Sequence, residues 1–127
     1  MLNNNKVTFF AITKEEILHD INKDFEMWND CLNEIDNFPS YVVIHWVART
    51  LYLLKYNEIA SKTDACSFLK KEYRNNDIIE LVKSMRDKSE IEFDEVKIDQ
   101  IKNEAKECLK LLCDKGKEFG LTIASSL

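Results

Sequence analysis

The clearest pattern in the sequence is a set of apolar positions that recur every three or four residues between residues 14 and 35. Thr13 and Glu16 stand just before it with the spacing of a capping box, which opens a helix. Pro39 and Ser40 follow it, and the residue before a proline avoids helical backbone angles. The pattern predicts an amphipathic helix from about residue 14. Its inward-facing residues are expected to be Leu18, Ile21, Phe25, Trp28, Leu32 and Ile35.

The same periodicity predicts four more helices along the chain. The second covers about Tyr41 to Lys55, and Asn57 is expected to close it in a left-handed conformation. The third follows the N-cap Ser61, and the fourth follows a polar break at residues 74–77. The last is expected to end near Gly116. Its inward face is expected to hold Val96, Ile101, Ala105, Cys108, Leu109 and Leu112.

Short connections between these helices favour neighbours that run in opposite directions. The expected fold is therefore all-α, with about five helices in an antiparallel up-down bundle over residues 14–127. Residues 1–13 contain an apolar stretch with no partner strand in the sequence. We expect them to form a short extended N-terminal arm.

Composition narrows the fold and the chemistry further. The 127 residues include only two glycines and one proline, and both glycines stand near the C-terminus. Sandwiches and barrels need turn residues at short intervals, so these classes are excluded. A Gly-rich phosphate loop cannot occur before Gly116, which excludes the Walker and dinucleotide-binding motifs. The sequence also lacks the hydrolase and metalloprotease motifs, and no catalytic residue is predicted.

Cysteine spacing and hydropathy indicate the cellular compartment in which the protein is expected. Cys31, Cys66, Cys108 and Cys113 form no Cys-x-x-Cys pair, so we interpret them as small core residues and predict no metal site. The N-terminus is polar where a signal peptide would be apolar, and the longest apolar run is too short to span a bilayer. The protein is therefore expected to be soluble and cytoplasmic, without membrane contact.

Acidic residues gather on the first helix. Residues 15–36 contain eight acids and one base, which disfavours nucleic acid and would attract a cationic ligand. Trp28 with Glu34 and Asp36 could hold an amino sugar, because an indole stacks beneath a sugar ring and carboxylates bind its ammonium groups. The alternative is that Trp28 belongs to the core and that the acids form a solvated helix face.

Three basic or titratable side chains also invite a functional interpretation. Lys62 stands in the first turn of the third helix, where backbone N–H groups and the helix dipole favour a phosphate. The alternative is an ordinary exposed lysine. His45, between two apolar residues, is expected to be a partly buried imidazole with its hydrogen bonds satisfied. His19 stands among carboxylates and is expected to be solvated.

An ordered set of motifs resembles a known family. The strings VVIHWVARTLY at residues 42–52 and EIASKTDA at residues 58–65 resemble the C-terminal helical domain of aminoglycoside adenylyltransferases that modify streptomycin and spectinomycin. The likeness extends upstream to Trp28-Asn29 and downstream to Ile78-Ile79. It covers residues 7–87, and the last helix loosely.

The resemblance implies specific roles. Trp28 would stack on the aminoglycoside, Glu34 and Asp36 would bind its ammonium groups, and Lys62 would contact the nucleotide phosphates. Complete enzymes of this family also use ATP and Mg²⁺, which an upstream nucleotidyltransferase domain holds with paired aspartates. This sequence contains no such aspartate motif, so we expect no catalysis by this chain alone and a separate nucleotidyltransferase domain as its partner.

A non-enzymatic interaction or dimerisation module is the alternative function. Phe68 and Asn57 stand where the family has tryptophan and glycine, and Pro39 stands where it has an acid. The apolar arm at residues 7–12 could be buried in a homodimer. The oligomeric state in solution separates this alternative from the ligand-binding domain.

Overall fold

The computed structural model describes residues 13–85 and 94–121. It confirms the all-α prediction for these residues, which form five α-helices and one short 3₁₀ turn. Residues 1–12 of the predicted arm lie outside the described residues. The elements in chain order are α2 (Lys14–Glu34), α3 (Tyr41–Tyr56), α4 (Lys62–Glu72), α5 (Asp77–Ser84), α6 (Glu95–Gly116) and η1 (Lys117–Phe119).

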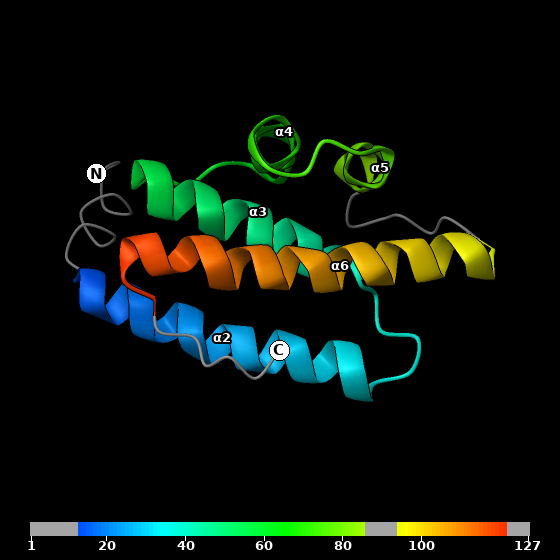
Figure 1. Cartoon of the computed structure of the whole chain (residues 1–127), viewed down its shortest axis with the longest axis horizontal. Helices are drawn as coiled ribbons and strands as arrows, with labels where there is room; N and C mark the ends of the chain where they lie inside the picture. The colour runs from blue at the N-terminus through cyan, green and yellow to red at the C-terminus, as the bar shows by residue number, and fades with distance from the viewer. Residues whose placement is uncertain (1–12, 86–93, 122–127) are drawn as a thin grey trace, which may run out of the picture.

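The helices form two sets that cross each other. Helices α2, α3 and α6 lie along the long axis of the molecule, with α2 running opposite to both α3 and α6 (Figure 1). Helices α4 and α5 are seen end-on in the same view, so they lie across α3. Helix α3 packs against α4 and α6, while α2 packs against α6. The predicted up-down antiparallel order is therefore not confirmed.

The predicted helix boundaries rest on local contacts that the structure contains. The Thr13 hydroxyl accepts from Glu16 N at 3.1 Å, and Glu16 Oε1 accepts from Thr13 N at 3.0 Å, which completes the capping box. Ser61 Oγ accepts from Asp64 N at 3.1 Å and caps α4. Asn57 closes α3 with φ 57°, as predicted. These boundaries follow from the sequence because each depends on residues three or four apart.

The capping box makes the start of α2 sensitive to pH. The Thr13 backbone N–H, and then its hydroxyl, lower the pKa of Glu16 from its ordinary value of 4.5. A lowered pKa means that this contribution is present at neutral pH and is lost as the pH falls through the folded-state value. We expect the first-turn amides of α2 to lose exchange protection in acid, and Glu16→Gln to lose less, as measured by NMR. An equal loss in both proteins would contradict this prediction.

The core lies mainly around α3, whose residues Val43, Ile44, Val47 and Ala48 are fully buried. Helix α2 contributes Ile21, Phe25 and Leu32, as the apolar pattern predicted, and α6 contributes the five predicted residues after Val96. Cys66 and Cys108 are buried, as expected, whereas Cys31 and Cys113 are only half-buried.

Two residues predicted to face inward are exposed. Ile35 has 50% of its surface exposed, because it is the C-cap of α2 and has left the helical conformation. Val96 has 65% exposed, because the first turn of α6 extends past the ends of α2 and α3 (Figure 1). Both positions continue the helical period in sequence, but none of the helices in the described part of the chain covers them.

A partly buried ion pair connects the turn between α4 and α5 to α6. Arg74 Nε donates to Glu104 Oε2 at 2.7 Å and Arg74 Nη2 donates to Glu104 Oε1 at 2.8 Å. The Glu104 side chain is only 8% exposed. This bond raises the pKa of Arg74, and burial raises the pKa of Cys108 so that its thiol stays protonated and can donate to Glu104. The apolar periodicity did not predict this ion pair. A charged residue such as Glu104 is normally expected on the surface, and the sequence alone does not show that it is buried.

Candidate functional site

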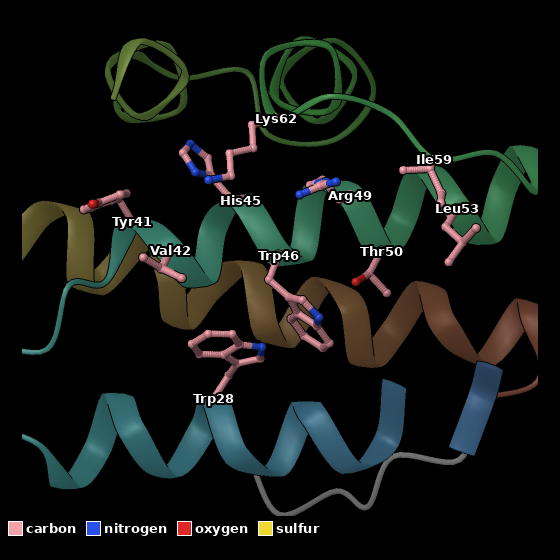
Figure 2. Close-up of a pocket in the computed structure, with 10 residues that line it drawn as sticks. All are labelled: Trp28, Tyr41, Val42, His45, Trp46, Arg49, Thr50, Leu53, Ile59 and Lys62. Carbon is pink, nitrogen blue, oxygen red and sulfur yellow. The ribbon is translucent and has the colours of Figure 1, made fainter. Parts of the chain in front are cut away.

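A pocket of about 430 Å³ lies over the face of α3 that looks towards α2 and the start of α4 (Figure 2). Most of its lining comes from α3, where residues four apart fall on one side of the helix. The ten lining residues are Trp28, Tyr41, Val42, His45, Trp46, Arg49, Thr50, Leu53, Ile59 and Lys62.

Trp28 reaches from α2 across to α3 at one side of the pocket (Figure 2). Its ring centroid lies 6.3 Å from that of Trp46 and 6.0 Å from that of Phe38. The side chain is half-buried and packs against the core. Its buried Nε1 has no hydrogen-bond acceptor among the described residues. Trp28 therefore belongs to the core packing and lines the pocket as well, so the two interpretations of its position are compatible.

Two polar side chains of α3 are fixed by contacts with other elements. His45 is 4% exposed, and its Nε2 lies 2.9 Å from the Val82 carbonyl oxygen at the end of α5. The predicted hydrogen bond is present, and the imidazole is buried more completely than predicted. Arg49 Nε donates to the Ala60 carbonyl at 3.1 Å, which holds the guanidinium beside the start of α4. The position of these side chains thus depends on how α4 and α5 cross α3.

Lys62 is the first residue of α4 and lines the other side of the pocket. Its side chain reaches from α4 down towards α3 (Figure 2). The preceding Ser61 caps the helix, so α4 begins at this edge of the pocket. The first N–H groups of a helix and its dipole favour negative charge. An anion at this place would meet a lysine, an arginine and a helix N-terminus together.

The structure brings together two of the four predicted binding residues. Trp28 and Lys62 line the same pocket, although they lie on different helices. Glu34 and Asp36 are exposed at the end of α2 and are not among the lining residues. Arg49 and Trp46 line the pocket without having been predicted to do so. Trp46 and Arg49 are three residues apart, which places them on the same side of α3. Because apolar residues occur on several sides of α3, the sequence did not show which side stays open to solvent.

The acidic start of α2 forms a shallow, solvent-exposed surface. Glu15, Glu16, His19 and Asp20 line it, and each is exposed. Within residues 13–85 and 94–121, no group of three or more histidine, cysteine or acidic side chains is arranged to hold a metal ion. In the same part of the chain, no helix combines the length and apolar character needed to cross a membrane.

The pocket brings aromatic rings and fixed positive charge into one concave site. Such a combination can stack a planar ring and neutralise an anionic group at the same time.

Comparisons of the chain with protein-family models, curated proteins and solved structures found no match.

Proposed function

We propose that the chain is a helical nucleotide- and substrate-binding domain resembling that of aminoglycoside adenylyltransferases, acting with a separate catalytic domain. One observation supports this most directly. Trp28 and Lys62, which the resemblance assigns to the drug and to the nucleotide, line a single pocket. Ligands that react with each other must lie side by side, and one pocket lined by both residues meets that requirement.

In this proposal each binding residue has a defined task. Lys62 binds the phosphates of ATP through its ammonium group, helped by the start of α4. Trp28 stacks on the aminoglycoside ring, and Glu34 and Asp36 take its ammonium groups from the exposed end of α2. The catalytic domain supplies the carboxylates that hold Mg²⁺ and the transfer chemistry itself.

Reconstitution tests the proposal. The chain is mixed with the catalytic domain of an adenylyltransferase of this class, and adenylyl transfer to streptomycin and spectinomycin is measured. We expect Lys62→Gln to raise the KM for ATP by about tenfold, because a charge-assisted contact is worth roughly 1.5–3 kcal/mol. Lys71→Gln, at an exposed position of the same helix, is the matched control and should leave the KM unchanged. Absence of transfer, with the two domains shown to associate, would contradict the proposal.

A homodimerisation module is the second candidate, and one observation favours it. Several large apolar side chains are exposed on α2 and α6, among them Met27 at 46% and Ile98 at 49%. Burial of these side chains against a second copy of the chain would remove apolar surface from water. Sedimentation velocity distinguishes the candidates: a stable dimer supports the module, and a monomer supports the ligand-binding domain.

A further inference from the structure

The lining of the pocket is poorly suited to a polycation. Of the ten lining residues within residues 13–85 and 94–121, none is aspartate or glutamate, whereas Arg49 and Lys62 are cationic. A drug with several ammonium groups would meet like charge there and would lose hydration without compensation. The acids that the resemblance assigns to the drug, Glu34 and Asp36, lie outside this lining. The charge of the pocket therefore favours an anion.

The opposite side of the same pocket is aromatic. Trp28 and Trp46 lie with their ring planes tilted by 44°, and Tyr41 lies in the first turn of α3 beside His45. Indole faces bind planar rings, and stacking on an aromatic side chain is worth about 1–3 kcal/mol for a nucleobase.

The volume of the pocket suits one small ligand. Its volume of about 430 Å³ lies in the lower part of the range for a site that holds one drug-sized molecule. The aromatic and the cationic residues all line this one space. One ligand can therefore contact both kinds of residue.

We propose that the pocket binds a single planar anion, with its ring against Trp28 and Trp46 and its anionic group against Arg49 and Lys62. This goes beyond the proposed function, because it concerns the chain without a catalytic domain and without a bound aminoglycoside, when both tryptophans can contact the ring of an anion. A nucleoside phosphate and an aromatic carboxylate share this chemistry.

The chain provides its own probe for a test. It contains two tryptophans, and both line the pocket, so intrinsic fluorescence reports on this site. Full-length chain is titrated at low salt with AMP, with benzoate and with streptomycin. We expect a saturable change with at least one anion at a Kd below about 1 mM, and no saturable change with streptomycin. Tighter binding of AMP identifies a nucleoside phosphate, and tighter binding of benzoate identifies an aromatic carboxylate.

Two matched variants locate the ligand. Lys62→Gln is expected to weaken binding of the preferred anion about tenfold, since it removes one charge-assisted contact. Lys71→Gln should bind as the wild type does, because Lys71 is exposed on α4 and does not line the pocket. Because Lys62 is itself exposed, its replacement should leave the fold intact, which the thermal unfolding midpoint checks.

Three results would overturn the inference. They are no saturable change with either anion, tighter binding of streptomycin than of both anions, and wild-type affinity in Lys62→Gln. Each concerns the isolated chain, whereas the proposed function is tested by adenylyl transfer in the assembled enzyme. A failure of one proposal is therefore visible separately from a failure of the other.

Discussion

Replacing Arg74 with methionine is expected to lower the free energy of unfolding by about 3 kcal/mol, which is the usual cost of leaving one buried charge without its partner. The reason is the position of Glu104, whose side chain is 8% exposed and receives two hydrogen bonds from the guanidinium. Methionine fills a similar length but donates nothing, so the carboxylate loses both guanidinium hydrogen bonds and keeps only the thiol of Cys108 as a donor. Urea unfolding followed by circular dichroism measures the loss.

The matched control removes both charges. The double variant Arg74→Met with Glu104→Met should recover most of the stability, because an apolar pair of similar volume avoids desolvating two ions. The pair also ties the turn before α5 to α6, so the single variant should increase amide exchange in α5 more than in α2. Equal losses in the single and the double variant would show that packing, not the unpaired charge, accounts for the effect.

Truncation of Ile44 to alanine is expected to cost about 3 kcal/mol, within the range of roughly 2–5 kcal/mol for such changes in well-packed cores. Ile44 lies on α3 with no exposed surface, so removing its side chain leaves a cavity at the centre of the core. The same truncation at Ile98, which is 49% exposed on α6, should change stability by less than about 0.5 kcal/mol.

Because the two substitutions delete identical atoms from helices, the difference between them measures burial alone. Helix propensity slightly favours alanine at both sites and cancels in the comparison. Thermal and urea unfolding should give the same order. A loss at Ile98 as large as that at Ile44 would mean that another surface covers the start of α6 in solution, as the dimerisation candidate requires.

The helices could be predicted from the sequence because their signals are local. Thr13, Ser61 and Asn57 act on backbone groups within one turn, and the apolar period of α2 is read over its own length. The crossing of α4 and α5 over α3 could not be predicted in this way. It depends on which apolar faces meet, and a connection as short as that between α3 and α4 is compatible with several directions.

The candidate site was predictable only in part, for a related reason. Lys62 could be predicted because the start of a helix favours anions, and Trp28 because an indole followed by carboxylates can bind an amino sugar. Arg49 could not be predicted, because the position of its guanidinium depends on a hydrogen bond to the Ala60 carbonyl, which lies outside α3. Trp46 follows the apolar period of α3, but the structure leaves it half-buried at the pocket, because α2 packs against α6 and covers this part of α3 less.

The packing of α2 against α6 sets an order of events during synthesis. Helix α2 leaves the ribosome first, but the helix that covers it is made last of the described helices. Helices α3, α4 and α5 contact one another and can associate while α6 is still being translated. We therefore expect the apolar side of α2, with Phe25 at its centre, to stay accessible to chaperones for that interval and to be buried when α6 packs against it.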